Sequence, residues 1–409
     1  MCIRDREDTE ALFFDANGDG NMDLFVGSGG NNGPPGIIEM QDRLYFNSSN
    51  GDFNIDYKAL PLNGMNTSKA IALDYDLDGD MDLFVASRSY PGEYGMDPQN
   101  FMYENLGQGK FREVLTPTKS ALAFIGMITD VEWVNVDGSD GSELVVVGEW
   151  MAPRIFKFNG VTFIEVDTNL KPYTGMWQSI TSADIDKDGD MDLILGNIGS
   201  NGYLFDEKKL PVKVYIKDFD NNGMPEKILT RTIDSKDMTV VMKREMVEQL
   251  SMLKKKNLKH HDYANKNIHE LLGGAIENAL VRSFSHVKSE IAINDGKGNF
   301  TLSSLPMEVQ LSSANDILVT EINDDNYLDL IIVGNKTGFQ AQFGQLDCNP
   351  GLVLFNDTKG GFVVKKNAET GISISGVSKQ IMNIRQNGKD LFIVARNNEK
   401  PYIFVKNEK

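Results

Sequence analysis

Four stretches of the chain place acidic or amide side chains at every second position of a short loop and follow them with a glycine. In the clearest of them, Asp74, Asp76 and Asp78 occupy positions 1, 3 and 5, Gly79 position 6 and Asp82 position 9. Glycine lets the backbone turn sharply, so the side-chain oxygens can converge. Crowded carboxylates repel one another unless a divalent cation neutralises them. The pattern predicts a cation loop, and calcium suits it best because this ion accepts six to eight oxygens in irregular geometry.

The loop pattern recurs along the chain, and repetition at periods of tens of residues is typical of repeat architectures. Copies start at residues 15, 74, 135, 184, 218, 321 and 382, although the third, sixth and seventh depart from the motif. We therefore expect several structural calcium ions in the other four copies. Their predicted ligands are Asp15, Asn17, Asp19, Asp23, Asp74, Asp76, Asp78, Asp82, Asp184, Asp186, Asp188, Asp192, Asp218, Asp220, Asn222 and Glu226.

A short apolar run follows most of the loops, as in Leu83-Phe84-Val85, and about 20 residues later comes a hairpin with an Asn/Gly turn. Such runs indicate buried strands, so each repeat predicts four antiparallel strands, which is one blade of a β-propeller. The seven loop starts predict an all-β, seven-bladed propeller that spans residues 1–409 as a single domain. Six blades are the alternative, because the segment from Asn197 to Pro211 is too short for a hairpin and the loop at Asp218 would then be an insertion.

Residues 233–287 interrupt the β pattern. Met242, Met246, Leu250 and Leu253 recur at helical spacing beside a polar, lysine-rich face. We expect an α-helical insertion in the fifth blade.

The face opposite the acidic loops is the predicted ligand surface. The B strands end there and the A strands begin there, so the side chains at these positions gather near the axis. Two tryptophans beside amides and charges would suit a sugar or a peptide, whereas the alternative is that both tryptophans fill the space between blades. The residues at these positions are Ser28, Arg88, Glu149, Trp150, Trp177, Asn197, Asn335, Lys336 and Arg396.

Composition excludes several classes of function. A formal net charge of −18 over 409 residues argues against nucleic acid as a partner. The chain has no apolar run long enough to span a membrane, and its two cysteines imply neither a disulfide framework nor a zinc site. No serine-hydrolase, zinc-protease or phosphate-loop motif occurs, so we expect a protein that is not an enzyme.

The repeated D-x-[DN]-x-[DN]-G-x-x-[DE] loop followed by an L-F-V-type strand resembles the FG-GAP/VCBS repeat family, whose propellers are like those of integrin α-subunits. The segment Val212–Leu229 with the helical stretch after it resembles bacterial VCBS-repeat proteins of the ASPIC/UnbV-associated type. The resemblance implies a secreted or cell-surface adhesion module. Because the charged residues Met1–Thr9 run directly into a calcium loop, we expect a piece of a longer secreted protein, with other domains of that parent chain among its partners.

Two functions remain open at this point. The first is a calcium-stabilised extracellular module that binds a glycan or a protein ligand. The alternative is a polysaccharide-active hydrolase or lyase whose groove lies on the face opposite the calcium loops, with Glu149 among its carboxylates.

Overall fold

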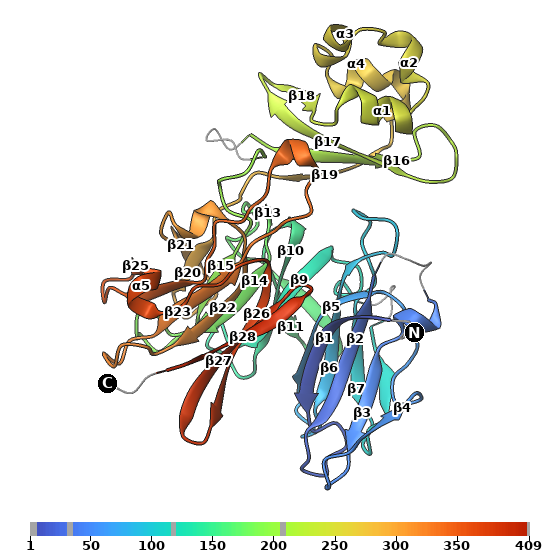
Figure 1. Cartoon of the computed structure of the whole chain (residues 1–409). Helices are drawn as coiled ribbons and strands as arrows, with labels where there is room; N and C mark the ends of the chain where they lie inside the picture. The colour runs from blue at the N-terminus through green and yellow to red at the C-terminus, as the bar shows by residue number, and fades with distance from the viewer. Residues whose placement is uncertain (1–5, 31–35, 116–119, 205–209, 407–409) are drawn as a thin grey trace.

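The computed structural model describes residues 6–30, 36–115, 120–204 and 210–406 (Figure 1). In this part of the chain the strands form seven antiparallel sheets, as the all-β prediction requires. Six of the sheets share one plan, in which the first strand pairs with the second, the second with the third and the third with the fourth where a fourth is present. The second strand is largely buried in the first five of these sheets, which explains its continuous apolar run, whereas in the last sheet it is mostly exposed or half-buried.

The first three sheets follow the predicted repeats directly. In the third, a short strand, β13, also pairs with the end of β10. Their strands are β1 (Glu7–Phe14), β2 (Asp23–Gly29), β3 (Arg43–Asn47) and β4 (Phe53–Asp56); β5 (Asn66–Leu73), β6 (Asp82–Ser89), β7 (Phe101–Asn105) and β8 (Phe111–Glu113); and β9 (Met127–Val134), β10 (Glu143–Met151), β11 (Arg154–Phe158), β12 (Phe163–Val166) and β13 (Gly175–Met176).

The next three sheets complete the series, and the last of them has three strands among the described residues. Their strands are β14 (Ser179–Ala183), β15 (Asp192–Gly196), β20 (Glu290–Asn294) and β21 (Phe300–Ser304); β22 (Ala314–Thr320), β23 (Asp329–Gly334), β24 (Leu352–Asn356) and β25 (Phe362–Lys365); and β26 (Ser378–Gln386), β27 (Lys389–Arg396) and β28 (Glu399–Val405). Short helices η1 (Ile38–Met40), η3 (Val309–Leu311), η4 (Ala341–Phe343) and α5 (Asn367–Thr370) lie in the connections.

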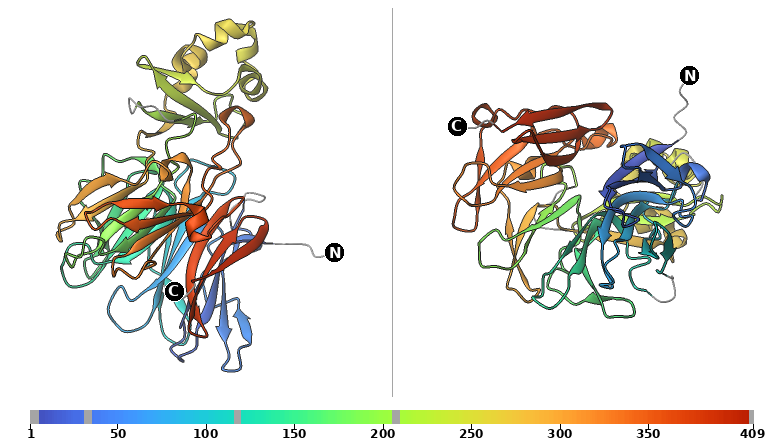
Figure 2. Two further views of the ribbon diagram at one scale, coloured as in Figure 1. Left: turned by 60° about the vertical axis from the view of Figure 1, so that its left-hand side comes forward. Right: turned by 90° about the horizontal axis from the view of Figure 1, so that it is seen from below.

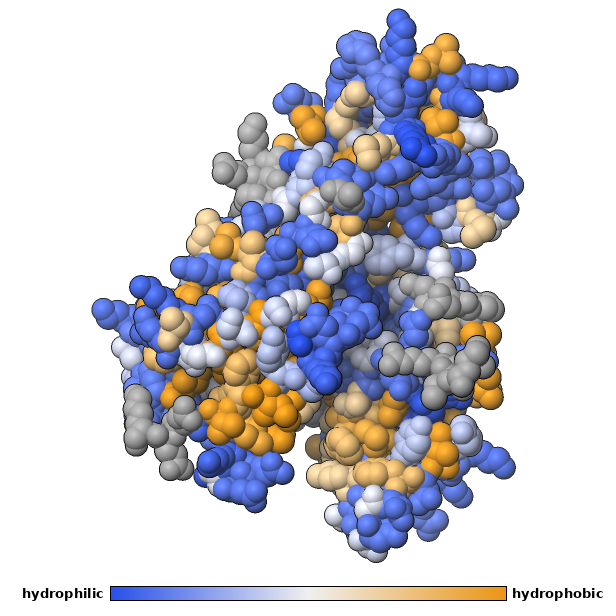
Figure 3. All heavy atoms as spheres, viewed as in Figure 1, coloured by the Kyte–Doolittle hydropathy of each residue, from blue (hydrophilic) through white to orange (hydrophobic). Residues whose placement is uncertain are grey.

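The first strands of the six sheets lie side by side around a common centre. Strand β1 contacts β5, β5 contacts β9, β9 contacts β14, β14 contacts β22 and β22 contacts β26. The right-hand view of Figure 2 shows the sheets following one another around this centre from blue to red. Within the described residues β1 and β26 are not paired, and Figure 3 shows a hollow between their two sheets.

The seventh sheet interrupts the fourth one. Leu193 of β15 pairs with Ala292 of β20, so the fourth repeat takes its second hairpin from residues about 100 positions later in the chain. The prediction that the loop at Asp218 opens a fifth blade is therefore wrong, because that loop lies in a separate sheet inserted between β15 and β20. The inserted sheet consists of β16 (Val212–Lys217), β17 (Glu226–Ile233), β18 (Lys236–Thr239) and β19 (Leu280–Phe284).

The helices of the insertion occupy a narrower range than residues 233–287, since strands lie at both ends of that range. One face of the inserted sheet packs on these helices through Tyr215, Phe219 and Ile228. The other face packs through Val214 on Trp150 and its neighbours, so the insertion rests on the six-sheet body (Figure 1). Of the described helices, none has the length and apolar character to cross a membrane. The helices are α1 (Lys243–Gln249), α2 (Leu253–Lys256), α3 (His260–Ala264), α4 (Ile268–Leu272) and η2 (Gly273–Ile276).

Acidic loops and a polar axial cavity

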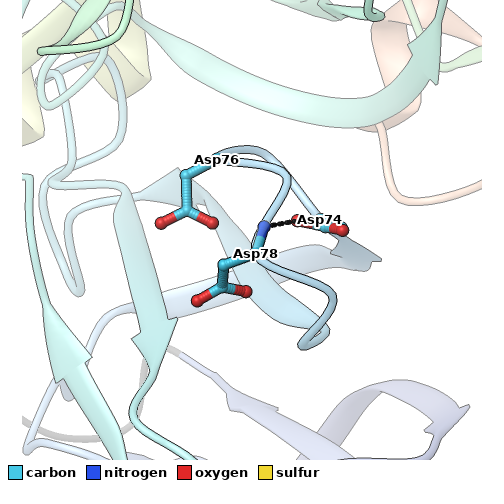
Figure 4. A group of neighbouring side chains, drawn as sticks. All are labelled: Asp74, Asp76 and Asp78. Atoms are coloured by element: carbon cyan, nitrogen blue, oxygen red, sulfur yellow. Dashed lines mark hydrogen bonds between the residues drawn. The ribbon is translucent and has the colours of Figure 1, made fainter.

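The loop between β5 and β6 brings three carboxylates together. Oxygen atoms of Asp74, Asp76 and Asp78 all lie within 4.8 Å of one another (Figure 4). The carboxylate of Asp74 also accepts hydrogen bonds from the backbone N–H groups of Asp78 and Gly79, each at 3.1 Å. Gly79 has a φ of +95°, the left-handed conformation that the tight turn needs. This geometry offers a divalent cation several hard oxygen ligands from one loop.

Two further loops form clusters of the same kind. The carboxylates of Asp184, Asp186 and Asp192 converge within 4.8 Å, as do those of Asp218, Asp220 and Glu226. Oxygen Oδ1 of Asp184 is buried without a hydrogen-bond partner in the described structure. A buried carboxylate oxygen without a donor is costly, so it is well suited to a cation. The donor sets of these loops therefore fit a metal ion.

The first loop makes the same backbone turn but has an amide, that of Asn17, at position 3 in place of a carboxylate. Asp15 accepts hydrogen bonds from the backbone N–H groups of Gly18, Asp19 and Gly20 at 2.8–3.1 Å. The amide of Asn17 donates to the carboxylate of Asp19 at 3.2 Å. The loop is thus closed by its own hydrogen bonds, and its predicted ion stays a prediction. The same holds for Asp188 and Asn222, which lie outside the three acidic clusters.

In four of the loops the acidic residue at position 9 is buried and joins the loop to its sheet through hydrogen bonds. Asp82 accepts hydrogen bonds from the backbone N–H groups of Tyr75 at 3.4 Å and of Asn105 at 2.8 Å. Asp192 does the same with Ile185 and Asn294, and burial raises the pKa of Asp192 to about 6 and that of Asp82 to about 7. Asp23 and Asp329 repeat the arrangement. In these four loops the residue therefore ties the loop to the hairpin of its own sheet.

In three sheets an asparagine at the end of the third strand links that sheet to the preceding one. The side-chain amide of Asn105 donates to the carbonyl of Ala16 at 3.0 Å, and that of Asn294 donates to Val136 at 2.8 Å. Asn356 donates to the carbonyl of Ile185 at 3.1 Å. Sequence reasoning took these asparagines only as hairpin residues, although β3, β7, β20 and β24 all end in asparagine, which was a usable signal.

The degenerate third loop holds an internal cation. The ammonium group of Lys157, on β11, lies 2.6 Å from Asp137 and 3.1 Å from Glu143 and also contacts the hydroxyl of Ser139. The hydrogen bond to Asp137 raises the pKa of Lys157. The lysine thus supplies from within the chain the positive charge that the other loops lack.

On the opposite face a buried carboxylate collects three donors. Oxygen Oε1 of Glu149 accepts hydrogen bonds from Arg88 at 2.7 Å and Lys336 at 2.9 Å, and Oε2 accepts one from the hydroxyl of Tyr94 at 2.7 Å. Burial raises the pKa of Glu149, but Arg88 and Lys336 outweigh burial and hold it well below its usual range. Glu149 is therefore a fixed negative charge. It positions the two basic side chains.

The structure brings together only part of the predicted ligand surface. Arg88, Asn335 and Lys336 line one cavity. Trp177 is fully buried and its indole N–H donates to the carbonyl of Tyr173, which speaks against its predicted contact with a ligand.

The remaining predicted ligand residues are also engaged within the protein. Trp150 is buried against Phe284 of the insertion, with ring centroids 5.0 Å apart, and Asn197 is buried beneath the same insertion. The guanidinium of Arg396 pairs with Glu399 and lies over the ring of Tyr402. None of these three side chains is placed to contact a ligand on that face.

The cavity lies on the axis and has a volume of about 490 Å³. The first strands of five sheets line it, together with Arg88 of β6, Gln178 just before β14 and the residues that follow β23 and β27. Every side chain that lines it is polar or charged. The lining residues are Glu7, Asp8, Thr9, Glu10, Thr67, Ser68, Lys69, Arg88, Thr129, Asp130, Gln178, Asn315, Asp316, Asn335, Lys336, Lys379, Gln380 and Asn397.

β-Bulges place one layer of these side chains. The pairing register shifts beside Glu10 on β1, Lys69 on β5, Asp130 on β9, Asp316 on β22 and Gln380 on β26. A bulge redirects the side chains next to it, and here it turns one polar side chain of each strand toward the axis.

This layer places one lysine among three carboxylates. Lys69 lies 3.5 Å from Asp130 and 4.0 Å from Glu10. Burial raises the pKa of Glu10 to about 7 and that of Asp316 to about 6.

Comparison with known proteins identifies part of the chain. Residues 15–85 match the family of FG-GAP-like repeats. The biofilm matrix protein Bap1 of V. cholerae aligns with a TM-score of 0.32 at 10% identity, covering 98% of this chain and 87% of Bap1. The N-terminal domain of Nup159 aligns with a TM-score of 0.38 at 8% identity, covering 98% of this chain and 75% of that domain. No curated protein matches the chain in sequence.

Proposed function

We propose that this chain, whose residues 15–85 carry an FG-GAP-like repeat, is a calcium-stabilised β-propeller of six blades that acts outside the cell as a binding module for a glycan or a protein. The observation that carries the proposal is the arrangement along the inner strands. Acidic loops lie at one end of these strands, and a wholly polar cavity lies between the strands. Rigid strands are thus stabilised at one end and present donors and acceptors along the axis.

Calcium is the ion that we assign to the loops. The clusters around Asp74, Asp184 and Asp218 supply only oxygen ligands from short, irregular loops, which favours calcium over magnesium or a transition metal. When bound, calcium neutralises the carboxylates and fixes the turn between the first and second strands. Extracellular modules bind this ion with dissociation constants of roughly 10⁻⁴–10⁻³ M, which suits a location outside the cell, either secreted or at the cell surface.

The enzymatic alternative has no support at Glu149. A general acid needs a raised pKa, but Arg88 and Lys336 hold the pKa of this carboxyl low and occupy one of its oxygens. Tyr94 occupies the other oxygen. We therefore assign Glu149 to the positioning of basic side chains and propose that the chain is not an enzyme.

Binding of the intact chain to immobilised glycans and to extracellular matrix proteins tests the proposed function. We expect saturable binding to at least one of these classes in millimolar calcium and its loss in EDTA. Heat-unfolded protein serves as the control for nonspecific adsorption. Absence of saturable binding to any glycan or matrix protein, with the chain folded and calcium present, would overturn the proposal. Turnover of a bound glycan that disappears in the Glu149→Gln variant would establish the enzymatic alternative instead.

A further inference from the structure

The axial cavity has an excess of positive charge at one end. Arg88 and Lys336 share one oxygen of Glu149. Lys379, on β26, lines the same cavity and, in the part of the chain that the structure describes, has no hydrogen-bond or ion-pair partner. Three basic side chains therefore face a single carboxylate, and two positive charges remain without a counter-charge at this end.

These basic groups are close enough to affect one another. Burial lowers the pKa of Lys379, and the charges of Arg88 and Lys336 lower it further, whereas Glu149 opposes this change. A negatively charged group bound between the three cations would relieve the repulsion. Coulombic attraction of this kind is much stronger in a recessed site than in open water.

The rest of the cavity fits a ligand rich in hydroxyl groups. Its lining includes the amides of Gln178, Asn315 and Asn335, which can donate and accept hydrogen bonds. Beside them lie Glu10 and Asp316 of the bulge layer, which can accept hydrogen bonds from ligand hydroxyls. A volume of about 490 Å³ is within the usual range for small-molecule sites. Among the described lining residues no aliphatic or aromatic side chain occurs, which disfavours an apolar peptide side chain.

We propose, building on the proposed binding function, that this cavity binds a uronic acid unit of an acidic glycan. The carboxylate of the sugar lies against Arg88, Lys336 and Lys379. The ring hydroxyls bond to the amides and to the carboxylates of the bulge layer. A neutral sugar lacks the group that the basic end requires and therefore binds more weakly.

Lys379 offers the sharpest test because its side chain makes no hydrogen bond or ion pair with the described residues that its removal would break. Lys379→Met keeps the length of the side chain and leaves the pairs of Glu149 intact. The probes are a tetragalacturonate and the neutral cellotetraose, titrated into the calcium-loaded chain by calorimetry at low salt. We expect tetragalacturonate to bind at least tenfold more tightly than cellotetraose. Lys379→Met should weaken the binding of tetragalacturonate at least tenfold and change the affinity for cellotetraose by less than twofold.

Lys58→Met, at an exposed lysine far from the cavity, is the matched control and should bind as the unchanged protein does. Equal binding of the charged and neutral probes, or a Lys379→Met variant that binds tetragalacturonate normally, overturns the inference but leaves the proposed binding function standing. If neither oligosaccharide binds, the inference is also overturned. The proposed function then falls only if the screen of glycans and matrix proteins is negative as well.

Discussion

The carboxylate of Asp82 and the backbone N–H of Asn105 form a 2.8 Å hydrogen bond that fixes Asn105 where its side chain reaches the preceding sheet. From this position the amide donates to the carbonyls of Ala16 and Met81. The acidic loop, the hairpin of its own sheet and the neighbouring sheet are thereby joined through two side chains. The same relationship recurs at Asp192 and Asn294.

Replacing Asn105 with alanine should destabilise the protein. The substitution leaves the two carbonyls without their donor, at a cost of about 1–3 kcal/mol in the free energy of unfolding. Asn47→Ala is the matched control, because the amide of Asn47, as the structure describes it, donates to Met22 of its own sheet and not to a neighbouring sheet. Thermal unfolding measured by circular dichroism should show a clear decrease in Tm for Asn105→Ala and a smaller one for Asn47→Ala. Equal decreases would contradict the role of Asn105 as a link between sheets.

Lys157→Met should make the third loop sensitive to calcium. The methionine removes the ammonium group that neutralises Asp137 and Glu143, so these carboxylates repel each other. In EDTA we expect the free energy of unfolding to fall by about 1–3 kcal/mol. In millimolar calcium the decrease should be smaller, because the loop without the lysine can bind a cation from solution. Tm measured under both conditions checks this. A loss of the same size in calcium and in EDTA would argue against the lysine as a substitute for an ion.

Glu132→Gln should stabilise the protein at high pH only. Burial raises the pKa of Glu132 from 4.5 to about 7, despite the hydrogen bond from Ser182. Between these values the folded protein keeps a proton that the unfolded chain has released, so this group makes stability fall as pH rises from about 4.5 to about 7. The amide does not titrate. We expect a higher Tm than that of the unchanged protein at pH 8 and a nearly equal Tm at pH 4, with exposed Glu308→Gln as control.

Trp177→Phe should affect stability and leave ligand binding unchanged. The phenylalanine loses the hydrogen bond to Tyr173 and part of the stacking on His286, which should lower the free energy of unfolding by about 1–3 kcal/mol. Tetragalacturonate binding by the folded variant should equal that of the unchanged protein. A variant with normal stability and impaired binding would restore the ligand role that the sequence allowed for this tryptophan.

The sequence predicts the repeat well because the repeat is local. In the first, second, third and fifth sheets the acidic loop, its following apolar strand and its hairpin lie within about 45 residues, and glycines such as Gly79 mark the turns. The run from Leu83 to Val85 accordingly lies in a buried strand. Ligand spacing in the loops is also local, so the clusters at Asp74 and Asp184 could be expected from the residues alone.

What the sequence does not predict depends on pairing between distant residues. The ladder from Leu193 to Ala292 crosses the whole insertion, and no local signal shows that β20 completes the fourth sheet. Lys157 follows the third loop by more than a dozen residues, so it enters the cation position only through the register of β11 on β10. The axial cavity combines side chains from several sheets, and Lys379 belongs to it only because the first strands lie around one centre.

Thermal unfolding of the intact chain in millimolar calcium and in EDTA is the measurement that tests the central claim most directly. Three carboxylate clusters that bind calcium in the folded state and lose it on unfolding must stabilise the folded state by mass action. We expect Tm to be higher in calcium by several degrees and to rise with calcium concentration. The increase should be reduced in a variant that carries Asp74→Asn and Asp184→Asn. Coincident unfolding curves in calcium and in EDTA would contradict the account.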